Sequence, residues 1–346
     1  MISSDHSKKT FANKTASLTI DLFGGAIIDF HLHENGINPL SFVFSNEQMP
    51  DNNKSGAPYQ GHFVCLGRWG APSDGEINAG LPNHGQAANI HWKLEDQSEH
   101  TCKMHVDASL EGLHVDRTSE MDKDNPVYRI TEEVTNVNPL GRLYHIVQHP
   151  TLARPFLDEA LIVNSNATMG FNALAETIEN TISNWPEGIC EDKSVVNVIS
   201  PDREYSSVFS YVVNKESDLG WISAYSPTHN LVLGYLWNRS DYPWINVWQH
   251  WEEGEITYRG LEFGSTGVHK PFKEILEAGI TTLLGEKTVD YIDAGESISR
   301  SYISFLCKAE PGFNGIEDIK MRNGTITIKS INAGQPIIIN SNLNDL

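Results

Sequence analysis

Residues 242–251 read YPWINVWQHW and show the alternation on which the fold prediction rests. In an extended strand, successive side chains point to opposite faces. The even-numbered residues from Trp244 to His250 therefore share one face, and the odd-numbered ones from Ile245 to Trp251 share the other. We expect a β-strand here. Tryptophans on a strand either pack in the core or line a ligand site, and Trp248 is the first candidate for a ligand site.

Period-two alternation and runs of β-branched or aromatic residues recur along the chain. The expected strands cover residues 17–22, 127–135, 207–213, 231–237, 245–248, 301–307, 325–328 and 336–339. Asn323-Gly324 precedes one of these runs and predicts a two-residue hairpin turn. Helical periodicity is confined to residues 172–180 and 274–280. Many strands with few short helices predict an all-β fold, a large antiparallel β-sandwich.

The chain has 346 residues, enough to bury a large core. The main sandwich domain is expected over residues 1–307. Residues 308–346 would be too small to fold alone, so we expect them to form a C-terminal β extension packed on the main domain. The polar stretch 46–58 is expected to be a long loop.

The net charge of −20 limits the classes of partner. The 25 basic residues are scattered, with no run longer than Lys8-Lys9, which argues against nucleic acid. Long-range repulsion would also slow the approach of a polyanionic substrate. No stretch approaches the roughly 18 apolar residues of a membrane span, so no membrane partner is expected. The sequence does not indicate an oligomeric state.

Four dispersed cysteines, Cys65, Cys102, Cys190 and Cys307, form no CxxC pair. This spacing is typical of free thiols in a reducing compartment. The first 17 residues lack the apolar segment of a signal peptide. We therefore expect a cytoplasmic protein, with an exported chain whose leader has been removed as the alternative.

Three short segments, far apart in the chain, each carry a proton-handling side chain. They are Asn83-His84-Gly85, Gln148-His149-Pro150 and Gly260-Leu261-Glu262. Glu262 lies between two apolar residues, so in a strand it points to the face opposite them. Two histidines and a carboxylate can add a proton to one sugar oxygen while removing one from another.

The order and the local sequences of these segments resemble those of the aldose 1-epimerase, or galactose mutarotase-like, family. The chain is identified as a distant member. Further similarities follow the same order: Phe23-Gly24-Gly25-Ala26-Ile27-Ile28, Gly67-Arg68-Trp69, Trp92 after the His-Gly pair, and Ala294-Gly295-Glu296-Ser297. The resemblance implies the two-sheet supersandwich of that family. It also implies the interconversion of the α and β anomers of a neutral sugar, with no cofactor and no metal.

The resemblance implies a role for each matching residue. Glu262 would be the base that takes the proton of the anomeric hydroxyl, and His149 the acid that protonates the ring oxygen. His84 would complete the catalytic set by hydrogen-bonding the substrate. Arg68 would bind a sugar hydroxyl or steady the carboxylate, and Asn83, Gln148 and Trp248 would complete the substrate site.

The chain also departs from the family pattern. Gln86 replaces the second glycine of the His-Gly motif, Pro150-Thr151-Leu152 lacks the usual aromatic pair, and Phe263-Gly264 stands in place of Pro-Gln. The aspartate that many members use against sugar hydroxyls has no clear counterpart, although Asp241 and Asp202 are candidates. These departures leave the sugar specificity open.

Three alternatives remain open. A sugar-binding or sensing protein would keep the pocket but not the turnover. A carbohydrate-active lyase or hydrolase could use the same sandwich, but a uronate lyase wants a basic subsite that the acidic composition does not favour. A metal centre could draw on His84, His91, His149 and His250, although the spacing of the first two suits no zinc ligand pair.

Overall fold

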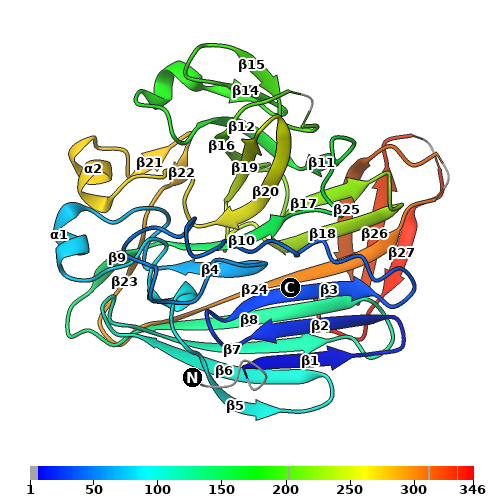
Figure 1. Cartoon of the computed structure of the whole chain (residues 1–346), viewed down its shortest axis with the longest axis horizontal. Coiled ribbons are helices and arrows are strands. Elements are labelled where there is room, and N and C mark those ends of the chain that lie inside the picture. Colours follow the sequence, from blue (N-terminus) through cyan, green and yellow to red (C-terminus); the bar gives the residue numbers. More distant parts are fainter. Residues whose placement is uncertain (1–6, 202, 311, 333) are drawn as a thin grey trace.

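The computed structural model describes residues 7–201, 203–310, 312–332 and 334–346. Two large sheets face each other and bury most of the apolar side chains between them (Figure 1). The first sheet contains, in spatial order, β1 (Lys8–Ala12), β2 (Ala16–Asp21), β3 (Ala26–Leu32), β4 (His62–Leu66), β10 (Ile146–Leu152), β20 (Glu255–Gly264), β19 (Trp244–Glu252), β16 (Ser207–Val213), β12 (Ala167–Asn172) and β13 (Ser183–Asn184).

The second sheet has eight strands. Their spatial order is β11 (Ile162–Ser165), β17 (Leu219–Ser226), β18 (Leu231–Asn238), β24 (Ser297–Lys308), β8 (Val127–Asn136), β7 (Leu113–Met121), β6 (Thr101–Ala108) and β5 (Lys93–Gln97). Every strand pairing in the two sheets is antiparallel in the described part of the chain. The all-β antiparallel sandwich expected from the sequence is confirmed.

Each strand expected from alternation overlaps an observed strand. The faces are also as predicted: Ile245 and Val247 lie in the core between the sheets, whereas Trp244 and Trp248 pack on the opposite side of β19. The Asn323-Gly324 hairpin is present between β25 (Ile316–Arg322) and β26 (Thr325–Ser330), with φ of 50° and 74° at the two turn residues. Positive φ at both positions is what a type I′ turn requires.

Helices are short and few in the described residues. They are α1 (Asp74–Asn78), α2 (Phe272–Glu277) and the 3₁₀ turns η1 (Gln86–Ala88) and η2 (Ile178–Thr181). The expected helix at 274–280 overlaps α2. The one expected at 172–180 is wrong over most of its length: Asn172 ends β12 and its side chain accepts the N–H of Leu174 to form a turn, and only the last residues fall in η2. No described helix has the length and apolar character needed to cross a membrane.

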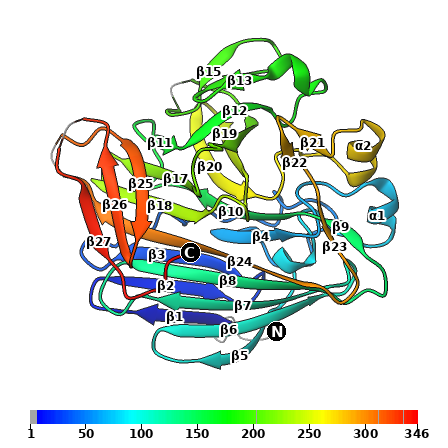
Figure 2. The same ribbon diagram turned by 180° about the vertical axis from the view of Figure 1, so that it is seen from behind.

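The remaining strands form small sheets around the sandwich. They are the pairs β14 (Glu187–Ile189) with β15 (Val195–Asn197), β21 (Thr282–Leu283) with β22 (Glu286–Lys287), and β23 (Asp290–Ile292) with β9 (Arg142–Tyr144). The C-terminal β25, β26 and β27 (Ile337–Asn340) make a three-stranded sheet at one side of the molecule (Figure 2). Its Ile319, Ile326 and Ile328 pack with Trp221 and Val232 of the second sheet.

Asp122, at the end of β7, ties the C-terminal segment to the sandwich. One carboxylate oxygen accepts the N–H groups of Asp124 and Asn125, and the other accepts the hydroxyl of Ser341 and the N–H of Asn342. Burial acts to raise the pKa of Asp122, but these hydrogen bonds outweigh it and hold the pKa below its usual value. The charged form is thus stabilised by the fold.

We expect Asp122→Ala to lower the free energy of unfolding by about 1–3 kcal/mol, because it removes hydrogen bonds to a charge. A carboxyl with a depressed folded pKa stabilises the fold above its unfolded pKa and loses that effect as the pH falls through the folded pKa. The difference between variant and wild type should therefore shrink in acid. Urea unfolding at several pH values measures it, with Asp124→Ala as the control, since in the described part of the chain the side chain of Asp124 pairs only with exposed Lys14. Equal losses in both variants would contradict this account.

Candidate functional site

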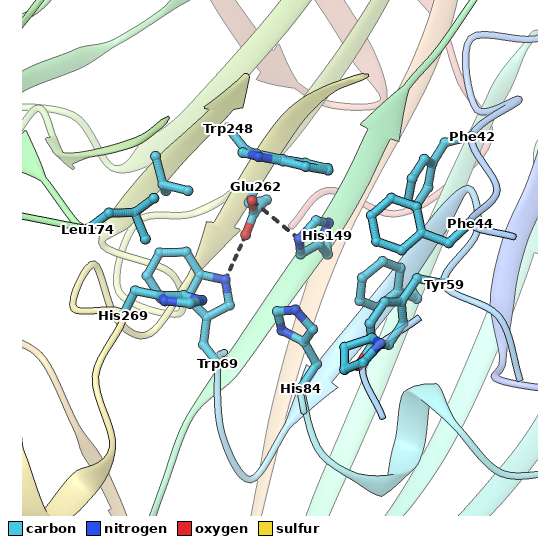
Figure 3. Close-up of a pocket in the computed structure, with 13 residues that line it drawn as sticks. Phe42, Phe44, Tyr59, Trp69, His84, His149, Leu174, Trp248, Glu262 and His269 are labelled. Atoms are coloured by element: carbon cyan, nitrogen blue, oxygen red, sulfur yellow. Dashed lines mark hydrogen bonds and ion pairs between the residues drawn. The ribbon is translucent and has the colours of Figure 1, made fainter. Parts of the chain in front are cut away.

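A pocket of about 250 Å³ opens on the face of the first sheet that is turned away from the second. Its walls are mostly aromatic, and its polar groups are three histidines and one carboxylate (Figure 3). The lining residues are Phe42, Phe44, Pro50, Tyr59, Phe63, Trp69, His84, His149, Leu174, Val208, Trp248, Glu262 and His269. Drug-sized ligands occupy pockets of about 300–1,000 Å³, so this one suits a smaller molecule.

Strand alternation places Glu262 in this pocket. Its neighbours Leu261 and Phe263 are buried in the core between the sheets, so the carboxylate points the other way. β10 pairs with β20 and brings His149 alongside, while β19 pairs on the other edge of β20 and contributes Trp248. Three neighbouring strands thus supply a carboxylate, an imidazole and an aromatic ring from segments far apart in the sequence.

Glu262 is almost wholly enclosed, with 1% of its surface exposed. Its Oε1 lies 3.3 Å from Nε2 of His149, and its Oε2 accepts the indole N–H of Trp69 at 2.7 Å. Burial raises the pKa of Glu262 to about 8, against the lowering effect of the Trp69 hydrogen bond. A carboxyl group with a pKa near neutrality can both take and give a proton.

His149 is held from two sides. Its ring stacks on Phe63 with 4.4 Å between ring centroids, and Nδ1 lies 3.0 Å from the hydroxyl of Thr151. Burial lowers the pKa of His149 to about 3, so its surroundings favour a neutral imidazole. With Glu262 protonated and His149 neutral, the pair holds one proton between its two groups from about pH 3 to about pH 8.

His84 sits in a turn with a φ of 58°, a conformation in which histidine is among the tolerated residues. Its Nδ1 accepts the backbone N–H of Gly70 at 3.1 Å, and the thiol of Cys65 lies 3.2 Å from the same nitrogen. The accepted N–H places the ring proton on Nε2. Burial lowers the pKa of His84 well below its usual value. His84 is therefore a neutral hydrogen-bond donor, 5.4 Å from the His149 ring centre.

Three of the residues expected at the substrate site do not line the pocket. Gln148 points to the opposite face of β10, where its amide donates to Glu132 at 2.6 Å. The guanidinium of Arg68 is buried in an ion pair with Glu76 of α1. Asn83 contributes its backbone carbonyl, which accepts the hydroxyl of Tyr59 at 2.7 Å.

The remaining candidates were two aspartates and the histidines of the metal alternative. Asp241 is not among the pocket residues, and Asp202 lies outside the described residues. The four histidines of the metal alternative do not converge: His91 stacks on Phe23, and His250 lies beside Tyr258 outside the pocket lining. Of that set, the structure brings together only His84 and His149 in the described residues.

His269 and most of the aromatic wall were not singled out from the sequence. His269 follows β20 and packs edge-on against Trp69 at 4.7 Å between ring centroids, and burial lowers its pKa to about 4. Gly70 makes this approach possible, because a Cβ there would lie 2.3 Å from Nε2 of His269. Its φ of 87° also favours glycine. The only available signal was the position of His269 soon after Glu262.

No family model and no curated protein matches the sequence. Solved structures do match the fold. The galactose mutarotase related enzyme of Lactobacillus acidophilus matches with a TM-score of 0.62 at 11% identity, over 88% of this chain and 98% of that chain. The galactose mutarotase-like protein of Lactobacillus casei gives 0.56 at 14% identity, over 87% of this chain and 100% of that chain.

A galactose mutarotase-like protein of Clostridium acetobutylicum matches with a TM-score of 0.57 at 12% identity, over 89% of this chain and 97% of that chain. The chain therefore has the galactose mutarotase-like fold, and the family resemblance read from the sequence is confirmed at the level of the fold. Fold alone does not assign an activity, which has to be argued from the site.

Proposed function

We propose that the protein is an aldose 1-epimerase that interconverts the α and β anomers of a neutral sugar. The observation that carries the proposal is the contact of 3.3 Å between His149 and Glu262 on the wall of an aromatic pocket. Aromatic rings stack on the C–H face of a pyranose. No lysine or arginine is among the lining residues, which suits an uncharged ligand.

The reaction opens the pyranose ring and closes it on the other face of C1. In the opening step, Glu262 as carboxylate takes the proton of the C1 hydroxyl while His149 as imidazolium gives one to the ring oxygen, and the C1–O5 bond breaks. The open aldehyde rotates, and both protons return as the ring closes. The pair begins and ends with one proton, so no metal or organic cofactor takes part. Burial of both groups favours that proton on Glu262, and transfer across the 3.3 Å contact gives the reactive form.

His84 serves as the substrate-binding member of the set. Its Nε2–H is free to donate to a sugar oxygen, because Nδ1 is engaged by Gly70. The ring of Trp248 lies on the side of Glu262 that is away from His84 (Figure 3). Binding and proton transfer are thus assigned to different groups, which variants can separate.

The pH dependence of the rate should reveal the one-proton pair. The pair loses its only proton as the pH rises through the pKa of Glu262, about 8, so activity should fall above that pH. Trp69→Phe removes a hydrogen bond that lowers this pKa, and should move the alkaline limit to higher pH. Polarimetry corrected for the buffer rate measures the limit.

The control for this shift is Trp251→Phe. Trp251 belongs to β19 but packs against the core outside the pocket, so its replacement should leave the alkaline limit unchanged. An alkaline limit that stays in place, or moves to lower pH, in Trp69→Phe would show that Glu262 is not the group that titrates.

Polarimetry on freshly dissolved α-anomers of hexoses, pentoses and deoxysugars tests the function itself, together with binding measured by tryptophan fluorescence. We expect at least one sugar to equilibrate faster than in buffer, with or without EDTA. A sugar that binds but equilibrates at the buffer rate would make the protein a sugar sensor. Loss of activity in EDTA would overturn the metal-free mechanism.

A further inference from the structure

A cluster of five metal-ligating side chains lies on the solvent face of the second sheet, on the strands at its β5 edge. Its members are Glu95 on β5, His105 and Asp107 on β6, and His114 and Asp116 on β7. We call this set the edge cluster. None of its members lines the sugar pocket.

The register of β6 and β7 produces the cluster. His105 stands opposite Asp116, and Asp107 stands opposite His114, so imidazoles and carboxylates alternate on a small square. Met104, Val106 and Val115 point to the core, so the square faces solvent. The two imidazoles occupy one diagonal, with 5.4 Å between their centroids.

Each imidazole is oriented by a carboxylate on its Nδ1. Oε1 of Glu95 lies 2.8 Å from Nδ1 of His105, and Oδ1 of Asp107 lies 2.7 Å from Nδ1 of His114. In metal sites, a ligating histidine almost always donates its other ring N–H to a carboxylate, carbonyl or water in this way. The arrangement leaves both Nε2 atoms for a further partner.

The third ligand is Asp116. Its Oδ2 lies 3.3 Å from Nε2 of His114, longer than the roughly 2.7–2.9 Å of a good charged hydrogen bond. Two ligands of a tetrahedral zinc ion with bonds of about 2.0–2.1 Å lie roughly 3.3 Å apart, and the centres of two such imidazoles roughly 5 Å apart. The ligand atoms that lie within 4.8 Å of one another are those of Glu95, His105 and Asp116, so Asp116 is the residue within reach of both His105 and His114.

The excess of negative charge around the cluster also favours the binding of a cation. Asp116 stands directly opposite Glu133 of β8, a like-charge pairing that destabilises a sheet. Lys93 contacts Oδ2 of Asp107 at 3.1 Å, and in the described residues it is the only lysine or arginine in ion-pair contact with the cluster. Asp116 and Glu133 are left without such a partner.

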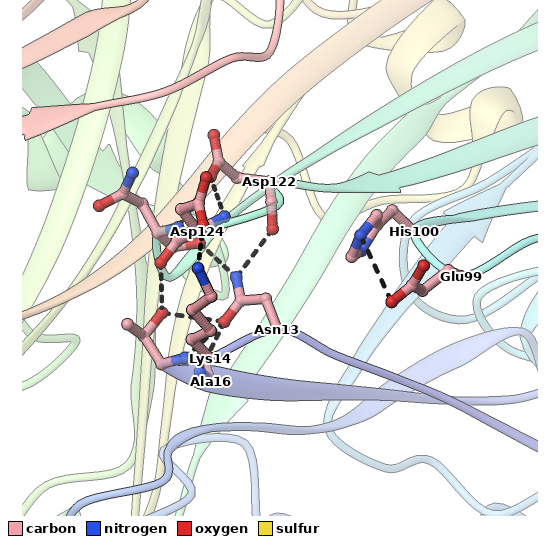
Figure 4. Close-up of polar contacts among 9 residues, drawn as sticks. Asn13, Lys14, Ala16, Glu99, His100, Asp122 and Asp124 are labelled. Carbon is pink, nitrogen blue, oxygen red and sulfur yellow. Dashed lines mark hydrogen bonds and ion pairs between the residues drawn. The ribbon is translucent and has the colours of Figure 1, made fainter.

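We propose that His105, His114 and Asp116 bind a divalent transition-metal ion of the zinc class, with Glu95 and Asp107 orienting the two imidazoles. Imidazole with carboxylate suits zinc better than calcium or magnesium, which prefer oxygen ligands alone. The bound ion would link β6 to β7. The polar network at Asp122 makes a useful contrast. The backbone N–H groups of Asp124 and Asn125 occupy one of its carboxylate oxygens (Figure 4), and donors of Ser341 and Asn342 occupy the other.

The test is a calorimetric titration of the EDTA-treated, dialysed full-length protein with Zn²⁺, and then with Ca²⁺. We expect one Zn²⁺ per chain and no comparable binding of Ca²⁺. His105→Asn and His114→Asn should each abolish the high-affinity binding. Asp107→Asn, which weakens the orienting contact and the ion pair with Lys93 but leaves the three ligands in place, should weaken it about 10-fold to 100-fold.

His31→Asn is the matched control, because His31 also pairs with a carboxylate, Asp29, and lies near a second histidine, His33. It should bind Zn²⁺ as the wild type does, and circular dichroism should show all variants folded. Zinc should raise the unfolding temperature of the wild type but not of His114→Asn. No saturable binding to the wild type, or wild-type affinity in either His105→Asn or His114→Asn, would overturn the proposal.

Discussion

Glu262→Gln is expected to reduce the rate of anomer interconversion by about 10²–10⁴, because the amide can neither take nor give the proton. The shape of the side chain is preserved, and an amide oxygen can still accept the indole N–H of Trp69. Sugar affinity should therefore stay close to that of the wild type. Exchange NMR on a sugar that the wild type turns over measures the rate, and fluorescence titration measures the affinity.

The same variant should be at least as stable as the wild type. The raised pKa of Glu262 means that the folded state holds its proton more tightly than the unfolded state, so stability falls as the pH rises from about 4.5 to about 8. Glu262→Gln removes that decline. A variant that keeps more than about a tenth of the wild-type rate would rule out Glu262 as the proton-transfer group.

His149→Asn is expected to lose a similar factor, about 10²–10⁴, because the ring oxygen then has no proton donor on its side of the sugar. Asparagine can hydrogen-bond the substrate but cannot carry the proton. The loss should appear in kcat and not in KM. Initial rates at several sugar concentrations, measured by polarimetry, separate the two constants.

His250→Asn is the control for this prediction. His250 is carried by β19 near Trp248 but does not line the pocket, so its replacement should leave the rate near that of the wild type. Equal losses in the two variants would indicate a general disturbance of the sheet. A His149→Asn variant with wild-type kcat would remove His149 from the mechanism.

Much of the fold could be predicted because the strands are amphipathic or wholly apolar. The alternation in residues 242–251 predicted the two faces of β19, and the apolar neighbours of Glu262 predicted the direction of its side chain. The same rule explains one miss. Gln148 is adjacent to His149 in a strand, so the two side chains point to opposite faces and cannot share the pocket.

Other parts of the site could not be predicted from local pattern. The family resemblance predicted that Arg68 binds the sugar. A buried guanidinium needs a charged partner, however, and Glu76 of α1 is that partner. The Ser73 to Glu76 spacing of a capping box was the available signal for that helix. Phe42, Phe44 and His269 come from loops, whose positions depend on packing rather than on periodicity.

The most direct test of the proton-pair account is a crystal structure of Glu262→Gln soaked with a sugar that the wild type turns over. We predict the sugar in the aromatic pocket, with its C1 hydroxyl about 2.6–3.2 Å from the side chain of residue 262 and its ring oxygen at a similar distance from Nε2 of His149. A sugar that binds elsewhere, or with C1 turned away from both groups, would contradict the account.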